Sequence, residues 1–184
     1  MRLFVGTAIA AADTSAIELA VASQLANAHW KPLERTYWHV TALFLGERSE
    51  NLVEPIAGTV ARIASFTPQM VLEHGRLLTM PKQDPTMLWV RFQPHIALTA
   101  LHLALAEATG TEPSIYRPYW PHITLARARA GKLETLDGPV IIPSLRLDHL
   151  SLFRSTPSPQ GAVHEPLATW AFSGADPIDP VVAA

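Results

Sequence analysis

The sequence lacks several features on which common enzyme classes depend. It contains no cysteine, which excludes disulfides, thiolate metal sites and a cysteine nucleophile. Charged residues make up only 16% of the chain and the formal net charge is −2, so no overall basic field is available to hold long nucleic acid. Neither a glycine-rich phosphate loop nor a His-Glu-x-x-His zinc motif is present.

Long apolar runs are also missing. No stretch approaches the ~18 consecutive apolar residues of a membrane span. Residues 1–12 contain one arginine and an apolar run, but the segment is short for a signal peptide and Gly6 and Thr7 interrupt it. We interpret this segment as a first strand and expect a soluble cytoplasmic protein with no membrane partner.

The composition is that of a folded domain, because 48% of the residues are hydrophobic. Apolar spacing predicts helices and strands along the chain: helices at about 51–65 and 94–109, strands at 70–72, 87–92 and 119–126, and short strands over about 140–172. Each half of the sequence holds strands, a helix and one strand with a repeated motif. This arrangement favours an α+β fold with antiparallel sheets over a parallel βαβ array. We expect one domain over residues 1–173 and a loose tail over 174–184.

Two short segments with the same pattern carry the functional signal. They are WHVTALFLG at residues 38–46 and PHITLAR at residues 121–127. Each contains His-x-Thr, and side chains two residues apart on a strand point to the same face. Each strand therefore presents an imidazole beside a hydroxyl. If the two strands face one another, two histidines and two threonines line one cleft.

This set of groups suits acid–base chemistry on a phosphodiester. Attack by water on phosphorus needs one group to accept a proton and another to donate one to the departing oxygen. Histidine, with an ordinary pKa near ~6.5, can do either near neutral pH, so we expect His39 and His122 to be catalytic. Thr41 and Thr124 would donate hydrogen bonds to the non-bridging phosphate oxygens. A single His-x-Thr is weak, because it also occurs on ordinary strands, and the matched pair is what favours function.

At these residues the chain resembles a known family. HVTALFLG and PHITLAR are similar to the two signatures of the two-histidine (2H) phosphoesterases, most closely the bacterial and archaeal RNA 2′,3′-cyclic phosphodiesterases, also called LigT-like 2′–5′ RNA ligases. The resemblance extends to about Phe172. The chain departs from the family pattern at Ala42 and Leu43, and at His164, where a tyrosine is common.

The resemblance implies both a fold and a reaction. The fold has two pseudo-symmetric lobes, each with an antiparallel sheet and outer helices, and the active-site cleft lies between the lobes. The implied reaction is hydrolysis of an RNA or nucleoside 2′,3′-cyclic phosphate to a 2′-phosphate, without metal or cofactor. By the same resemblance His39 corresponds to the proton donor and His122 to the acceptor, although the spacing alone does not assign that direction.

Two further candidates lie five residues after the histidines. The resemblance implies that Arg127 neutralises the phosphate. On a regular strand this odd offset from His122 would point Arg127 away from the site, so it can take part only if a bulge or a strand end intervenes. Phe44 has the same offset from His39. We interpret Phe44 first as a core residue and second as a platform for the nucleobase.

Basic residues and other aromatic and histidine side chains give weaker signals. Between residues 113 and 133 the chain has no acidic residue but contains Arg117, Arg127, Arg129 and Lys132. This local excess suits a small anion or an RNA end better than a duplex. The aromatic side chains next to the motifs could stack on a base, but they are more typical of core: Trp38, Tyr119 and Trp120. His95 and His102 fit a solvated helix face.

Several functions are compatible with the sequence. The leading hypothesis is a metal-independent RNA 2′,3′-cyclic phosphodiesterase. Alternatives are a 2′–5′ RNA ligase, another 2H enzyme acting on small cyclic nucleotides, and a non-catalytic RNA-end binder. A metal-dependent phosphodiesterase is disfavoured because no dense Asp/His cluster is visible in the sequence. The expected partners are RNA 3′ ends or small cyclic nucleotides, and we expect a monomer with no obligate protein partner.

Overall fold

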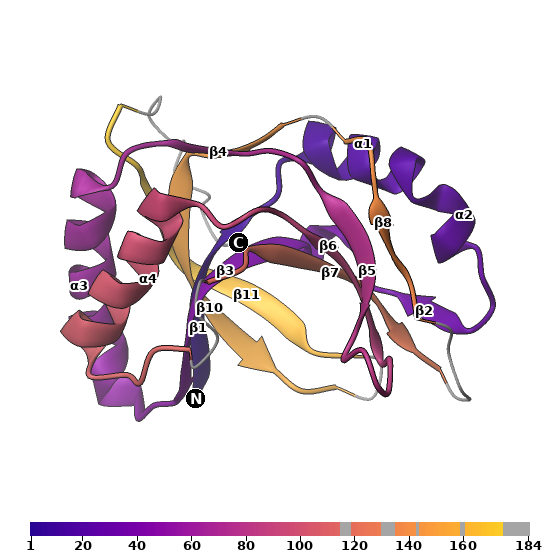
Figure 1. Cartoon of the computed structure of the whole chain (residues 1–184). Coiled ribbons are helices and arrows are strands. Elements are labelled where there is room, and N and C mark those ends of the chain that lie inside the picture. Colours follow the sequence, from indigo (N-terminus) through magenta and orange to yellow (C-terminus); the bar gives the residue numbers. More distant parts are fainter. Residues whose placement is uncertain (115–118, 130–134, 143, 159–160, 175–184) are drawn as a thin grey trace.

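The computed structural model describes residues 1–114, 119–129, 135–142, 144–158 and 161–174. Two antiparallel sheets form its framework, and helices lie outside them (Figure 1). The predicted α+β class with antiparallel sheets is therefore confirmed. Two of the candidate basic residues, Arg117 and Lys132, lie outside the described residues. The same holds for the expected tail, of which only residue 174 is described.

The first sheet carries the first His-x-Thr segment. Its strand order is β11-β10-β1-β3, and every neighbouring pair is antiparallel. The strands are β11 (Val163–Ala171), β10 (His149–Thr156), β1 (Arg2–Ala8) and β3 (His39–Glu47). Helices α3 (Val53–Phe66) and α4 (Ile96–Thr109) cover its outer side (Figure 1). Gly110 ends α4 with a φ of 61°, a left-handed conformation that favours glycine.

The second sheet carries the second segment. Its order is β2-β7-β6-β5-β8, again antiparallel throughout. The strands are β2 (Trp30–Pro32), β7 (His122–Ala128), β6 (Met87–Arg91), β5 (Arg76–Met80) and β8 (Asp137–Pro139). Helices α1 (Ala11–Ala20) and α2 (Ala22–Leu25) lie at this end of the molecule (Figure 1).

Smaller elements connect the two sheets. Strands β4 (Met70–Leu72) and β9 (Leu145–Leu147) form a separate antiparallel pair. Short 3-10 turns, η1 (Arg35–Tyr37) and η2 (Glu50–Leu52), precede β3 and α3. The chain passes from β1 in the first sheet to β2 in the second and back to β3, so each sheet takes strands from both halves of the sequence. No helix in the described part of the chain is both long and apolar enough to cross a bilayer.

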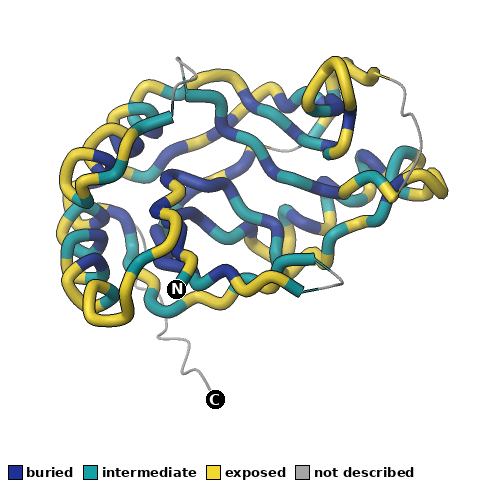
Figure 2. Tube along the Cα trace, turned by 90° about the horizontal axis from the view of Figure 1, so that it is seen from below, coloured by how far each residue is buried: buried dark blue, intermediate teal, exposed yellow. Residues whose placement is uncertain are grey.

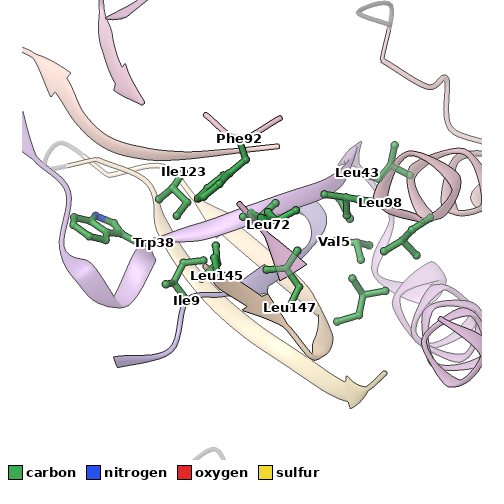
Figure 3. Packing of buried hydrophobic residues seen from close by; sticks show 14 of the residues in the cluster. Val5, Ile9, Trp38, Leu43, Leu72, Phe92, Leu98, Ile123, Leu145 and Leu147 are labelled. Carbon is green, nitrogen blue, oxygen red and sulfur yellow. The ribbon is translucent and has the colours of Figure 1, made fainter. Parts of the chain in front are cut away.

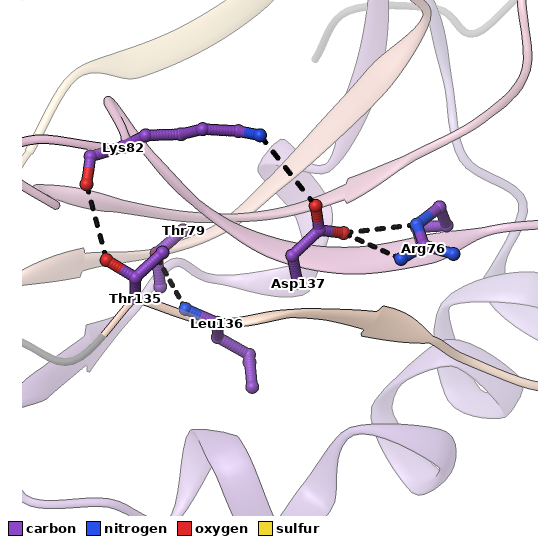
Figure 4. Close-up of polar contacts among 6 residues, drawn as sticks. All are labelled: Arg76, Thr79, Lys82, Thr135, Leu136 and Asp137. Atoms are coloured by element: carbon purple, nitrogen blue, oxygen red, sulfur yellow. Dashed lines mark hydrogen bonds and ion pairs between the residues drawn. The ribbon is translucent and has the colours of Figure 1, made fainter.

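Polar contacts hold β8 at the edge of the second sheet (Figure 4). The Arg76 guanidinium donates two hydrogen bonds, of 3.0 and 3.1 Å, to one carboxylate oxygen of Asp137. The backbone N–H of Leu136 donates to the Thr79 hydroxyl at 3.0 Å. These partly exposed contacts add little energy individually, but they fix a three-residue strand that covers the backbone edge of β5.

A single hydrophobic cluster joins residues of both sheets to residues of the helices that cover them (Figure 3). Val5 and Leu43 reach it from the first sheet, Ile123 reaches it from the second, and Leu145 and Leu147 of β9 lie in the same cluster. Figure 2 shows buried residues along the inner strands and exposed residues on the outward sides of the helices. The two histidine strands are therefore anchored on one core, which fixes how they sit relative to one another.

Candidate active site

The two motif histidines are oriented in the same way. Each begins its strand, and each ring Nδ1 lies close to the backbone carbonyl oxygen two residues earlier. The distances are 2.7 Å from His39 Nδ1 to Tyr37 O and 3.1 Å from His122 Nδ1 to Trp120 O. A carbonyl oxygen can only accept a hydrogen bond, so Nδ1 carries the proton in each ring. This leaves Nε2 as the nitrogen that can gain or lose a proton.

Both histidine strands bulge just after the threonine. Along β1, Gly6 lies opposite Thr41 and Val5 opposite Leu43, so Ala42 is the extra residue of β3. Along β6, Trp89 lies opposite Thr124 and Leu88 opposite Ala126, so Leu125 is the extra residue of β7. The two bulges fall at matching positions relative to their histidines. Each one shifts the side-chain alternation of its strand by one residue.

This shift decides where Phe44 and Arg127 point. After the bulge, the fifth residue beyond each histidine returns to the face that carries His and Thr. Arg127 is exposed there, so the odd offset from His122 is no obstacle to its facing the site. Phe44 is 60% exposed, so the interpretation of Phe44 as a core residue is wrong. The reason is the bulge at Ala42, which reverses the inside–outside pattern of a regular strand.

The bulge in β3 is supported by two side chains from other elements. His102 of α4 donates from Nδ1 to the Ala42 carbonyl at 2.7 Å, and its Nε2 accepts the Ser114 backbone N–H at 3.0 Å. The Tyr119 hydroxyl donates to the Thr41 carbonyl, and its ring stacks on His102 at 4.8 Å. His102 is only 5% exposed, so its expected place on a solvated helix face is wrong. Its partner is a backbone carbonyl, which leaves no signal in residue spacing.

Small residues lie beside the first His-Thr pair. In β1, Ala8 is opposite His39 and Gly6 is opposite Thr41. A Cβ atom on Gly6 would lie 2.7 Å from the Val40 carbonyl oxygen, so only glycine allows β1 and β3 to approach this closely. On the same strand as these small residues, the Phe4 ring lies 4.7 Å from the His39 ring and packs against it.

The corresponding face of the second sheet is cationic. Residues directly opposite one another in an antiparallel pair share a face. Arg91 lies opposite His122, and Lys31 lies opposite Arg127. Trp89, opposite Thr124, stacks on the His122 ring with centroids 3.8 Å apart and planes 17° apart. This face therefore joins positive charge to an imidazole held flat against an indole.

Aromatic side chains near the motifs differ in role. Trp38 is buried in the core, as expected from the sequence. Trp120 instead lies under the Arg91 guanidinium, 4.4 Å from the ring centroid, in a cation–π contact. Arg129 donates from Nε to the Trp30 carbonyl at 3.0 Å, so it is tied to the backbone of β2.

Burial disfavours the protonated form of both motif histidines. The pKa of His39 is lowered to about 4, mainly by burial and also by the nearby charges of His164 and His122, although the hydrogen bond to Tyr37 raises it. The pKa of His122 is also lowered, mainly by burial and then by Arg91. Charge on His122 reaches His39 although they belong to different sheets, and β3 and β7 lie against one another. The two imidazoles therefore lie near enough for the charge of one to act on the other.

A third histidine lies in the same place. His164 of β11 meets the His39 ring edge-on, with centroids 5.1 Å apart, and contacts the Phe4 ring at 5.0 Å. Its pKa is lowered by burial and by the charges of Arg127 and Arg2. In the sequence, His164 stands out only as a departure from a family pattern. Nothing in the local sequence of β11 marks it, because the signal is its position in space.

The described residues contain no group of three or more His, Asp or Glu side chains placed to hold a metal ion. The arrangement is instead two imidazoles whose Nε2 atoms have no hydrogen-bond partner within the described residues, two hydroxyls beside them and several cations. Such a site can bind an anion and transfer protons to and from it.

Comparisons with known proteins identify the family of this chain. The chain belongs to the 2′–5′ RNA ligase superfamily, whose model matches residues 9–159 and whose members are the two-histidine phosphoesterases. It is similar to two curated proteins named RNA 2′,3′-cyclic phosphodiesterase. The one from Bacillus subtilis is 28% identical over 64% of this chain and 67% of that protein. The one from Thermus thermophilus is 27% identical over 79% and 77%, respectively.

Solved structures share the fold. A crystal structure of a Thermus thermophilus protein superposes with a TM-score of 0.82 at 23% identity, covering 95% of this chain and 99% of that one. The apo form of Escherichia coli LigT gives 0.77 at 24% identity, covering 94% and 97%. The predicted two-lobed fold is thereby confirmed.

Proposed function

We propose that this protein opens the 2′,3′-cyclic phosphate of RNA 3′ ends, or of small cyclic nucleotides, and leaves a 2′-phosphate without using a metal. The observation that carries the proposal is the matched orientation of His39 and His122. Each holds Nδ1 on a backbone carbonyl and keeps Nε2 for proton transfer. The name shared by the two curated relatives supports the same substrate class.

The two histidines divide the proton transfers. One imidazole accepts a proton from water as the water oxygen bonds to phosphorus. The other donates a proton to the ribose 3′-oxygen as the P–O3′ bond breaks, so the phosphate stays on the 2′-oxygen. By the family resemblance, His39 is the donor and His122 the acceptor. Because burial lowers the pKa of His39 to about 4, the negative charge of a bound phosphate must raise that pKa before His39 can donate.

The remaining site residues hold the phosphate and the base. Thr41 and Thr124 donate hydroxyl hydrogen bonds to the non-bridging oxygens and keep phosphorus in line between the two rings. Arg127 neutralises their charge. Phe44, exposed on the same face as Thr41, offers a flat surface on which a nucleobase can stack.

The test uses an oligonucleotide that ends in a 2′,3′-cyclic phosphate, incubated with the protein in EDTA. The expected product carries a 2′-phosphate, and His39→Ala and His122→Ala should each slow its formation by ~10²–10⁴-fold. A requirement for added divalent metal would contradict the proposal, as would near-full activity in either variant. Joining of a 5′-hydroxyl strand would indicate ligation, whereas binding without turnover would indicate a non-catalytic RNA-end binder.

A further inference from the structure

The face of the first sheet carries an imidazole that the proposed reaction does not use. His164 is placed by β11, opposite Ser155 in the sheet register. Its ring packs edge-on against three neighbours, with centroid distances of 5.0 Å to Phe4, 5.1 Å to His39 and 5.9 Å to Tyr37. His164 therefore lies in direct contact with one of the two motif histidines.

Positive charge reaches His164 from both sheets. Arg127 of β7 and Arg2 of β1 are the charged groups that act on it. The other titratable neighbours are His39 and Tyr37, and the adjacent Arg154 and Glu165 form an ion pair with each other. An imidazole beside two guanidinium groups is repelled when protonated. An anion bound between them would attract both the protonated imidazole and the guanidinium groups, and so offset this repulsion.

His164 also has an unused polar atom. Its Nδ1 is buried and has no hydrogen-bond partner within the described residues. A buried polar nitrogen without a partner is costly, and such atoms in native proteins commonly mark the place of a ligand or a water. The ring thus combines an unsatisfied nitrogen with a setting of arginines, next to the histidine proposed to act on phosphorus.

We propose that His164 is a third phosphate-binding histidine of this site, whose ring N–H donates a hydrogen bond to a phosphate oxygen held by Arg127. This inference deepens the proposed function and rests on it for the identity of the substrate. The binding of a tetrahedral anion does not depend on that identity. His164 would hold the group in place while His39 and His122 move the protons, which makes it a binding residue rather than a proton carrier.

A phosphate-binding role for His164 predicts how anion affinity changes with pH. A protonated His164 binds an anion more strongly than a neutral one, so its contribution should be larger in acid. Sulfate is a suitable probe because its charge stays the same between pH 6 and pH 8. Changes in its affinity over this range therefore report protein groups alone.

The experiment compares sulfate binding by NMR titration at pH 6 and pH 8 in three variants. His164→Phe keeps a ring against Phe4 and His39 but loses both nitrogens, whereas His164→Gln keeps an uncharged donor. At pH 6 we expect His164→Phe to bind sulfate roughly 10- to 100-fold more weakly than the unaltered protein, and His164→Gln to fall between them. The control is His74→Asn, which changes a histidine that is 81% exposed and should leave sulfate affinity unchanged.

The outcomes separate this inference from the proposed function. Unchanged sulfate affinity in a folded His164→Phe would overturn the role of His164 even if the cyclic phosphate is still hydrolysed. Weakened sulfate binding supports the role even if the unaltered protein hydrolyses no cyclic phosphate. With an active protein, His164→Phe should raise KM for the cyclic phosphate more than it lowers kcat, whereas a purely structural role would not produce this split. If His164→Phe does not fold, His164→Gln tests the pH dependence instead. The proposal predicts that sulfate affinity rises from pH 8 to pH 6 by a larger factor in the unaltered protein than in His164→Gln, and equal factors would overturn it.

Discussion

Replacing His39 should change how the stability of the protein depends on pH. Burial lowers the pKa of this imidazole from its usual 6.5 to about 4 in the folded protein. Above pH 6.5 this imidazole is mostly neutral in both the folded and the unfolded chain, so it causes little loss of stability. As the pH falls from 6.5 towards 4, the unfolded chain takes up a proton that the folded protein refuses. The free energy of unfolding must therefore fall.

The size of this loss of stability follows from the difference between the pKa of His39 in the unfolded and in the folded chain. Each unit of pKa corresponds to ~1.4 kcal/mol, so a drop from 6.5 to about 4 amounts to about 3 kcal/mol by pH 4. At pH 5 roughly 2 kcal/mol of this is already lost, since the pH then lies about 1.5 below the unfolded pKa. His39→Asn removes the titration, and its amide can still donate to the Tyr37 carbonyl. Relative to the unaltered protein, this variant should gain roughly 2 kcal/mol between pH 7.5 and pH 5.

Urea unfolding at the two pH values measures this gain. The lowered pKa values of His122 and His164 also reduce stability in acid, but they do so in both proteins and largely cancel in the comparison. His74→Asn serves as a control and should show no such gain. If the stability difference between His39→Asn and the unaltered protein is the same at both pH values, His39 is not held neutral by burial.

Four other predictions concern the site. Because burial lowers the pKa of both His39 and His122, kcat/KM for the cyclic phosphate should be greatest below pH 6.5, with limbs that belong to the coupled pair; a pH–rate profile with its maximum at pH 8 would contradict this. Arg127→Gln should raise KM by roughly 10- to 100-fold and Arg127→Lys by less, as measured by steady-state kinetics, and an unchanged KM would remove Arg127 from the phosphate site. His102→Phe keeps a ring against Tyr119 but removes the hydrogen bond to the Ala42 carbonyl. It should lower the free energy of unfolding by about 1–3 kcal/mol in urea titrations, and equal stability would show that the bulge needs no such support. Gly6→Ala must displace the Val40 backbone, so kcat should fall by a larger factor than an exposed alanine substitution such as His74→Ala produces, and matching rates would refute the close-approach role of this glycine.

The sequence was most informative where the signal is local. A His and a Thr two residues apart on a strand share a face whatever surrounds them, and the structure places His39 and Thr41 on β3, and His122 and Thr124 on β7. The apolar spacing also located α3 and α4 to within two residues at either end. These features depend on neighbouring residues along the chain.

Features that depend on tertiary contacts were missed. The bulge at Ala42 follows from the pairing of β3 with β1, so alternation alone assigned Phe44 to the core although it is exposed. His102 was assigned to solvent because its partners, a carbonyl and a backbone N–H, come from segments distant along the chain. The three-residue strands β2 and β8 contain no run of apolar residues, so apolar spacing gave no sign of them, whereas it located β4.

The way in which both motif histidines are tethered has a consequence for sequence variation. Each Nδ1 is fixed by a main-chain oxygen, that of residue 37 or of residue 120, rather than by an aspartate or glutamate side chain. Every amino acid supplies that oxygen, so Tyr37 and Trp120 can be exchanged during evolution without loss of the tether. Homologous chains can thus vary immediately around their histidines and keep the imidazoles aligned. A tether of this kind also places no negative charge next to the imidazole.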